Sequence, residues 1–420
     1  MTLPTESPNP TVAPTTSSLP APEAVRTDLQ PALVALRRDL HRFPEVGLHL
    51  PRTQDRVLRE IEHLDGLEIT RGEGLSSLVV VLRGGARPAT GAQAVLLRGD
   101  MDALPVTEGS GFDFASDNGA MHACGHDLHT AGLVGAVHLL HGIKDRLAGD
   151  VVFMFQPGEE GHDGAGKMIE EGVLEAAGVP VVAAFGVHVS GDNELGHLYT
   201  RPGTWMSAAS MMNVTIRGRG AHGTRPHTGR DPVHAGAHMV TGLQEYITRR
   251  FDIFDPVVAT VGVFEGGTAV NVIPDTARME VTVRTFSNHT TERVLTELPE
   301  FMRNTARTYG LEAEVEFTVG LPATINDEAE TAFFLDTFTD LFGSSRVHVM
   351  PNPKSGSEDF SKILQRVPGT YGHIGVAPAG EDPAAQPSNH SPLVRHSDDA
   401  LGDQALFLAT LAERRLGIRD

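Results

Sequence analysis

After its first 26 residues the chain places apolar positions three and four residues apart. Leu29, Leu33, Leu36 and Leu40 follow this spacing, which predicts an amphipathic helix that ends before residue 41. A second helix is predicted over residues 53–64. Both segments are ordinary scaffold, because their apolar stripes suit packing and carry no unusual chemistry.

Short, uninterrupted aliphatic runs follow, and they are typical of strands that are buried on both faces of a sheet. An open parallel sheet places its ligand crevice at the carboxyl ends of such strands. The sequence therefore predicts an α/β catalytic domain with a doubly wound, mostly parallel sheet. Three of the runs are followed by residues that can bind metal or transfer protons. The run at 94–97 precedes the acidic residues at 100–102, the run at 150–155 precedes those at 159–160, and the run at 181–187 precedes the histidine at 188.

From about residue 207 the pattern changes to a β-α-β-β-α-β order. This order predicts an inserted ferredoxin-like α+β domain. The predicted strands cover 212–217, 257–265, 276–286 and 312–319, and the predicted helices cover 232–249 and 291–309. We therefore expect a tail over 1–26, a catalytic domain split into 27–206 and 321–420, and the inserted domain over 207–320.

Length and charge narrow the class of protein. A chain of 420 residues exceeds one ordinary core, and 34 basic against 54 acidic residues leave a net charge of −20. This charge argues against nucleic acid or an anionic membrane as partner. One cysteine excludes an intrachain disulfide, no apolar run reaches the ~18 residues that span a bilayer, and the Pro-, Thr- and Ser-rich start lacks signal-peptide features. We expect a soluble, cytoplasmic protein with a disordered N-terminal tail.

The single cysteine stands in the stretch Met-His-Ala-Cys-Gly-His-Asp at 121–127. Cys124 lies two positions before His126, and Gly125 lets the backbone fold tightly between them. Thiolate and imidazole bind Zn, Co or Mn directly, and a nearby carboxylate can bind or orient a ring. The stretch indicates half of a metal site. The alternative is a buried structural cysteine beside two histidines at a helix start.

Acidic residues supply the rest of the candidate site. Asp100 and Asp102 follow a strand, although turn chemistry before Pro105 would also explain them. Glu159 and Glu160 stand in a Pro/Gly turn, where their side chains point in different directions, which suits one metal ligand beside one free base. A solvated acidic turn is the alternative. The strand ends gather one predicted site from Asp102, Cys124, His126, Glu159, Glu160 and His188.

Several motifs together resemble the aminoacylase, indole-acetyl-amino-acid hydrolase and hippurate hydrolase branch of the dinuclear metallocarboxypeptidase (amidohydrolase) family. The resemblance runs in order from about residue 27 to residue 417 and leaves only the N-terminal tail outside. The motifs that carry it lie at 42–45, 99–105, 121–127, 156–161, 222–227, 271–274, 356–360 and 390–392.

Carried over residue by residue, the resemblance implies two divalent ions (Zn, Mn or Co), with Glu159 as the general base and Asp102 orienting a ligand. In the wider family a histidine stands where this chain has Asp100, and in this branch the Cys124-x-His126 pair compensates. The implied metal ligands are Cys124, His126, Glu160, His188 and His390.

The resemblance further implies hydrolysis of N-acyl-L-amino acids to a carboxylic acid and a free amino acid. In that reaction His222 would stabilise the tetrahedral oxyanion, Arg284 would hold the substrate carboxylate, and Asn271 would hydrogen-bond the substrate. Arg284 could instead be a surface cation on a strand. The resemblance also suggests that the insert acts as a lid and makes a homodimer or a higher homo-oligomer, so that His222 reaches the partner's site.

Two competing functions remain at this point. One is a dipeptidase or carboxypeptidase that uses the same dinuclear site. The other, from a different class, is a metal-bound but catalytically silent binding protein. A silent protein has no need of a free glutamate beside a ligand glutamate, so Glu159 favours an enzyme.

Overall fold

The structure, a computed structural model, describes residues 17–419. Residues 1–16 of the predicted disordered tail therefore lie outside the described residues, but its last part is helical. Helix α1 (Pro22–Asp28) packs against the closing helix α11 (Leu401–Leu416). Val25 is buried, and Arg26 makes an ion pair of 2.8 Å with Asp403 on α11. The prediction of disorder is wrong for residues 22–26, because a seven-residue helix is too short to show a periodic pattern.

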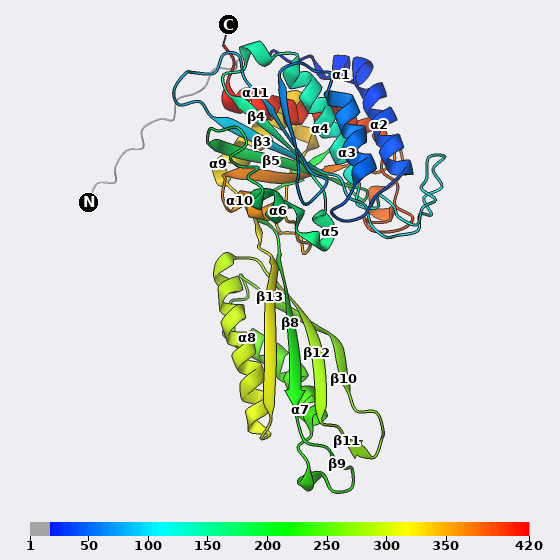
Figure 1. Ribbon diagram of the computed structural model, residues 1–420, viewed down its shortest axis with the longest axis vertical. Helices are drawn as coiled ribbons and strands as arrows, with labels where there is room; N and C mark the ends of the chain where they lie inside the picture. Colours follow the sequence, from blue (N-terminus) through cyan, green and yellow to red (C-terminus); the bar gives the residue numbers. More distant parts are fainter. Residues whose placement is uncertain (1–16, 420) are drawn as a thin grey trace, which may run out of the picture.

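The larger part of the molecule is built on an eight-stranded sheet (Figure 1). The strand order is β1-β2-β4-β3-β5-β16-β6-β15, and the four central strands β4, β3, β5 and β16 run parallel. The predicted mostly parallel α/β fold is confirmed. The strands are β1 (Leu67–Arg71), β2 (Leu78–Leu82), β3 (Ala94–Asp100), β4 (Asp150–Gln156), β5 (Val181–Ser190), β6 (Leu198–Thr200), β15 (Val347–Val349) and β16 (Gly369–Gly375).

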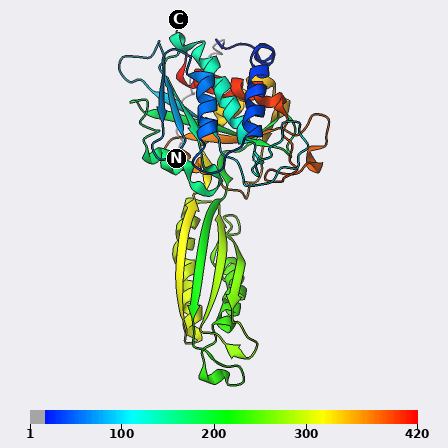
Figure 2. The same cartoon turned by 45° about the vertical axis from the view of Figure 1, so that its right-hand side comes forward.

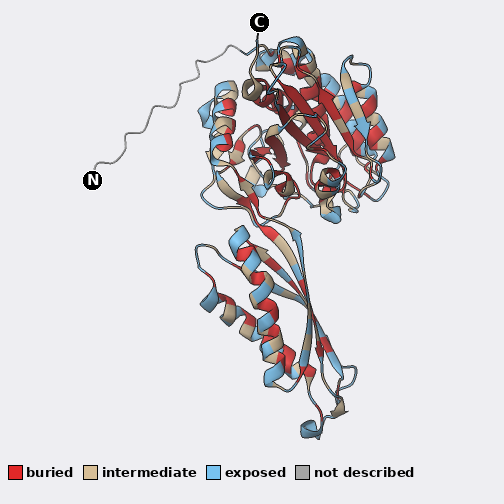
Figure 3. Cartoon of the chain, turned by 60° about the vertical axis from the view of Figure 1, so that its left-hand side comes forward, coloured by how far each residue is buried: buried red, intermediate tan, exposed pale blue. Residues whose placement is uncertain are grey.

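Helices cover both faces of this sheet, and strand β3 shows how the sequence selects the two layers. Successive side chains on a strand point to opposite faces. Val95 and Leu97 pack in the cluster formed with α2 (Gln30–Arg42), α3 (Pro51–Ile61), α4 (His126–His141), α9 (Glu328–Phe342) and α11. Leu96 packs in the cluster on the other face, with α6 (Gly164–Glu170) and the region of α10 (Ser361–Leu364). Figure 3 shows the sheet buried along most of its length.

The second unit has the expected β-α-β-β-α-β order. It pairs β8 (Ala208–Arg217), β10 (Val258–Gly266), β12 (Thr276–Thr285) and β13 (Glu312–Leu321) antiparallel in the order β10-β12-β8-β13. Helices α7 (Pro232–Arg250) and α8 (Asn288–Thr308) supply its own core with the strands. Figures 1 and 2 show the unit extending away from the eight-stranded sheet, with β9 (Ala221–His222) and β11 (Val272–Ile273) at its far end.

Two short strands that the sequence did not predict lie where the chain passes between the two units. Strands β7 (Gly203–Met206) and β14 (Thr324–Asn326) pair beside the junction of the two units. Three- and four-residue strands are too brief for a readable alternation of apolar and polar positions. Among residues 17–419, no helix has the length and apolar character needed to cross a membrane.

Candidate metal centre and active site

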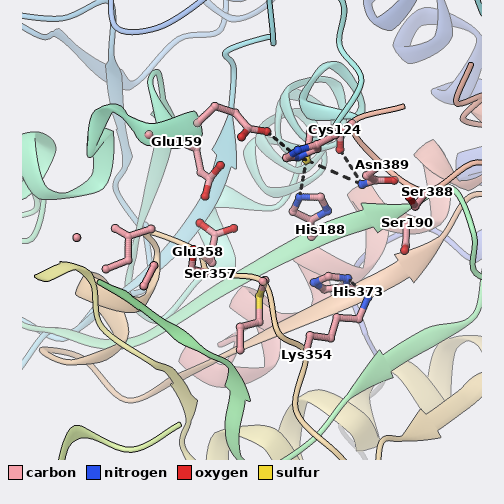
Figure 4. Close-up of a pocket in the computed structure, with 18 of the residues that line it drawn as sticks. Cys124, Glu159, His188, Ser190, Lys354, Ser357, Glu358, His373, Ser388 and Asn389 are labelled. Atoms are coloured by element: carbon pink, nitrogen blue, oxygen red, sulfur yellow. Dashed lines mark hydrogen bonds and ion pairs between the residues drawn. The ribbon is translucent and has the colours of Figure 1, made fainter. Parts of the chain in front are cut away.

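A cavity of about 640 Å³ opens between the two units. One wall comes from the carboxyl-end side of the eight-stranded sheet, including Cys124, Glu159 and His188 (Figure 4). Another wall comes from the second unit, where Ala209 and Arg284 line the space. The crevice therefore lies where a parallel α/β sheet is expected to bind its ligand.

Gly125 sets the positions of the first two candidate ligands. Its φ is +85°, and a Cβ there would lie 2.3 Å from Cγ2 of Val189. Only glycine fits both the left-handed backbone and the close approach of β5. The chain turns at Gly125 and enters α4 at His126, so that Cys124 and His126 both reach the site.

The five candidate ligands form two groups that share the thiolate. Cys124, His126 and His188 form one group of close ligand atoms, and Cys124, Glu160 and His390 form the other. Cys124 Sγ lies 3.4 Å from His188 Nε2 and 3.2 Å from His390 Nε2. Ligand atoms about 2.0–2.3 Å from an ion in a tetrahedral shell lie roughly 3.3–3.7 Å apart. The geometry fits two ions with Cys124 between them.

The hydrogen bonds around the two histidines leave a ring nitrogen of each available to bind a metal ion. Both ring nitrogens of His126 are buried and have no hydrogen-bond partner among the described residues. Each nitrogen lies 3.4 Å from a carboxylate oxygen, Nδ1 from Asp102 and Nε2 from Asp100. Buried polar atoms normally have a partner, so an ion on one nitrogen, with the other nitrogen facing its carboxylate, would satisfy the ring. His188 donates its Nδ1 proton to the carbonyl of Val189 at 2.6 Å, which leaves the Nε2 lone pair directed toward Cys124.

Asp102 organises the glutamate turn. Its two carboxylate oxygens accept the backbone N–H groups of Glu159 and Glu160, each at 3.0 Å. The turn is a single irregular helix, α5 (Glu159–His162), in which Glu160 has the non-helical angles φ −69° and ψ 73°. Carboxylate oxygens of Glu159 and Glu160 nevertheless lie within 4.8 Å of each other and of a His126 nitrogen, so the predicted divergence of the two side chains stays a prediction. Burial and the carboxylates of Glu358 and Asp359 raise the pKa of Glu159 well above its usual range.

A buried arginine near the site pairs with several carboxylates, a role that the sequence analysis did not assign to any residue. Arg98 on β3 makes ion pairs with Asp100 at 2.8 Å, Glu358 at 2.7 Å and Asp359 at 3.2 Å. Glu358 in turn accepts a hydrogen bond of 2.6 Å from the Tyr371 hydroxyl. The signal in the sequence was an arginine inside an otherwise aliphatic buried strand, followed much later by the Glu-Asp pair at 358–359.

Asn389 is a second residue near the site to which the sequence analysis assigned no role. Its side chain donates to the carbonyls of Cys124 at 3.2 Å and Val189 at 2.9 Å. It therefore ties the cysteine loop to β5. The next residue, His390, has a φ of +73°, which is uncommon for a non-glycine residue and occurs preferentially at functional sites.

The three remaining predicted site residues, which belong to the second unit, do not lie together. Arg284 lines the cavity and donates to the Ser357 hydroxyl at 3.2 Å. His222 and Asn271 do not reach the cavity of their own chain. His222 is exposed on β9 and pairs with Val272 of β11, next to Asn271, at the far end of the second unit (Figure 1). All the other predicted site residues lie at or beside the cavity.

Known proteins resemble this chain over most of its length. The IAA-amino acid hydrolase ILR1-like 4 of Arabidopsis thaliana is 35% identical over 398 residues, which cover 94% of this chain and 88% of that protein. The N-acetyl-L-cysteine deacetylase of Bacillus subtilis is 33% identical over 350 residues, covering 83% and 81%. The crystal structure of the Bacillus subtilis YXEP protein, described as a dinuclear metal binding peptidase from the M20 family, matches with a TM-score of 0.79 and 30% identity over 94% and 99% of the two chains. Residues 96–414 match the family described as Peptidase family M20/M25/M40, and this chain belongs to that family.

Proposed function

We propose that this metal-dependent amidohydrolase cleaves the amide bond of N-acyl-L-amino acids and releases a carboxylic acid and a free amino acid. The observation that carries the proposal is the pair of ligand groups sharing Cys124, with Glu159 beside them in the cavity. The likeness to an IAA-amino acid hydrolase and to an N-acetyl-L-cysteine deacetylase supports this class of substrate.

Two divalent ions, Zn, Mn or Co, are the proposed cofactors. His126 and His188 would hold one, Glu160 and His390 the other, and Cys124 both. Two such ions, when bound, polarise an amide carbonyl and lower the pKa of a shared water. The mixed thiolate, imidazole and carboxylate donor set suits these metals better than the oxygen ligands that Mg or Ca prefer.

Glu159 is the proposed general base. It takes the proton from the attacking water and passes it to the leaving nitrogen, which departs as an amine. Asp102 holds the backbone of Glu159 in place for this transfer. Glu160, one residue later, faces His390 at 3.1 Å and belongs to the ligand group.

The second unit supplies the proposed substrate contacts. Arg284 lies in the cavity wall, where its planar guanidinium can hold the α-carboxylate of the amino-acid half with two hydrogen bonds. His222 and Asn271 lie far from the site of their own chain, so we propose that they serve the partner's site in a homodimer. In that site His222 would donate to the oxyanion.

A peptidase is the second candidate, because the similar YXEP protein is described as a dinuclear metal binding peptidase. Both functions hydrolyse an amide bond by the same chemistry. They differ in the acyl half of the substrate, which carries a free amino group in a dipeptide and none in an N-acyl-amino acid. A free amine on the substrate would distinguish them, because a dipeptide carries a positive charge where an N-acyl-amino acid carries none.

The test incubates Mn-, Co- and Zn-loaded protein with N-acetyl-, N-benzoyl- and indole-acetyl-amino acids and with the matching dipeptides. The released amino acid is measured by chromatography, with Glu159→Gln protein as the blank. We expect release from N-acyl-amino acids at least about tenfold faster than from dipeptides, the ratio that corresponds to ~1.4 kcal/mol. Faster release from dipeptides would identify a peptidase. No release from either class, with two ions per chain shown by elemental analysis, would identify a binding protein.

A further inference from the structure

Lys354 is a second cation in the wall of the cavity, apart from Arg284. Its ammonium donates to His373 Nδ1 at 2.8 Å (Figure 4). The ammonium also lies 5.7 Å from the centre of the Trp205 ring. Its backbone N–H donates to the carbonyl of Trp205 at 2.8 Å, and its carbonyl accepts from Ser207 at 3.1 Å. Main chain and side chain together therefore hold the ammonium in one place.

This ammonium lacks a negative partner. It has three N–H donors, of which His373 takes one. Within residues 17–419 no carboxylate forms an ion pair with it. The carboxylate that acts electrostatically on Lys354 is that of Asp192, an exposed residue that also lines the cavity and accepts from the Ser190 hydroxyl at 2.7 Å. Burial lowers the pKa of Lys354, and Asp192 opposes this shift only in part.

His373 adds a second donor beside Lys354. An ammonium can only donate, so Nδ1 of His373 accepts and the hydrogen of the neutral ring is on Nε2. Nε2 is buried and has no partner among the described residues. A cation that is withdrawn from water and left unpaired is costly, and a bound anion removes that cost. The place is suited to a carboxylate, which has two acceptor oxygens.

We propose that Lys354 binds a second carboxylate of the substrate, so that the preferred substrates are N-acyl-L-amino acids with one carboxylate in addition to the α-carboxylate. The inference rests on the proposed function and on the assignment of the α-carboxylate to Arg284. The second carboxylate can belong to the acyl half, as in a succinyl group, or to the side chain of the amino acid, as in glutamate. A cavity of about 640 Å³ is large enough for either.

The kinetic test compares two acids with neutral compounds of similar shape. N-acetyl-L-glutamate is compared with N-acetyl-L-glutamine, and N-succinyl-L-alanine with N-butanoyl-L-alanine. The wild-type enzyme is expected to show a kcat/KM at least about tenfold higher for one acid than for its neutral counterpart. The pair that shows the preference identifies the half of the substrate that carries the second carboxylate.

Variants connect the preference to this residue. Lys354→Met keeps the length of the side chain and is expected to remove the preference, whereas Lys354→Arg retains part of it. Lys167→Met is the matched control, because Lys167 is an exposed lysine on α6 outside the cavity, and its variant should keep the wild-type ratio. No preference in the wild type, or a preference that survives Lys354→Met, overturns the proposal. An equal fall for acids and neutral compounds also overturns it, because Lys354 would then bind the α-carboxylate or act structurally.

A binding measurement separates this inference from the proposed function. The four compounds are titrated calorimetrically into metal-loaded Glu159→Gln protein and into Glu159→Gln/Lys354→Met protein. An acid that binds at least about tenfold more weakly to the double variant, with no such change for its neutral counterpart, supports the carboxylate site. Equal binding overturns it. If the wild-type enzyme cleaves none of the compounds, the proposed function fails, and this titration still decides the role of Lys354.

Discussion

The carboxylate of Asp102 accepts the backbone N–H of Glu159 at 3.0 Å, across 57 positions of the chain. Its other oxygen does the same for Glu160. The Asp102 side chain therefore fixes the backbone of both the proposed base and a proposed metal ligand, although Asp102 itself is neither a proposed base nor a proposed ligand. The turn has no other side-chain cap at its start, so the placement of both glutamates depends on this carboxylate.

Asp102→Asn should weaken metal binding by roughly 10- to 100-fold, the usual effect of removing a group that orients ligands. The amide keeps one acceptor oxygen and turns an NH₂ group toward a backbone N–H, so one of the two hydrogen bonds is lost. Titration of metal-free protein with Zn or Mn measures the affinity. An unchanged affinity would show that the turn holds its shape without Asp102.

Glu159→Gln should abolish turnover and leave the bound metal nearly unchanged, whereas Glu160→Gln should lose metal. The reason is that Glu160 lies in one ligand group with Cys124 and His390, whereas Glu159, which lies near His126 and Glu160, is the proposed base. Elemental analysis of both purified variants, beside an activity assay, makes the comparison. Equal metal loss in the two variants would mean that the roles are divided wrongly.

Cys124 should react slowly with a thiol reagent in metal-loaded protein and quickly after chelation, because coordination occupies the thiolate. The residue is only 7% exposed, so burial by itself predicts slow reaction in both forms. Since this is the only cysteine in the chain, the absorbance of the released thiol reports this site alone. A rate that is insensitive to chelator would refute the ligand assignment.

Mixing Glu159→Gln and His222→Ala proteins should restore activity, if His222 serves the partner's site. After dissociation and reassociation, each mixed dimer would contain one site with both residues intact. His222 lies at the far end of the second unit, away from the cavity of its own chain. The assay compares the mixture with each variant treated alone. Proven subunit exchange without recovered activity would place the donor in its own chain and leave the two-metal chemistry untouched.

Arg98→Met should lower the free energy of unfolding of the metal-free protein by roughly 3–5 kcal/mol, because buried carboxylates would lose their cation. Those carboxylates belong to Asp100, Glu358 and Asp359. Urea unfolding followed by the fluorescence of the single tryptophan measures the change, since Trp205 packs in the core cluster of the same sheet face.

Arg71→Met is the matched control for this stability measurement. Arg71 makes an ion pair with Asp55 at 3.4 Å, but both side chains are more than half exposed. Exposed pairs contribute about 0–1 kcal/mol. A similar loss of unfolding free energy in the two variants would contradict the role of Arg98 in neutralising the buried carboxylates.

Local sequence determined the elements that hold most of the site. Aliphatic runs specified β3, β4 and β5, because residues with no polar side chain are stable only where both faces of a strand are covered. Gly125 specified the turn between Cys124 and His126, because its left-handed backbone tolerates no side chain. These features depend on a few neighbouring residues, so a pattern along the chain is enough to predict them.

Tertiary packing decided the contacts between distant segments. Cys124 meets His390 across 266 positions, and Arg98 meets Glu358 across 260. Local patterns do not encode which loops meet, because such contacts depend on how the layers pack and on the energy of burying charges together. For the same reason the sequence predicted His222 as a site residue but not its position at the far end of the second unit, and residues 22–26 form a helix through burial of Val25 against α11.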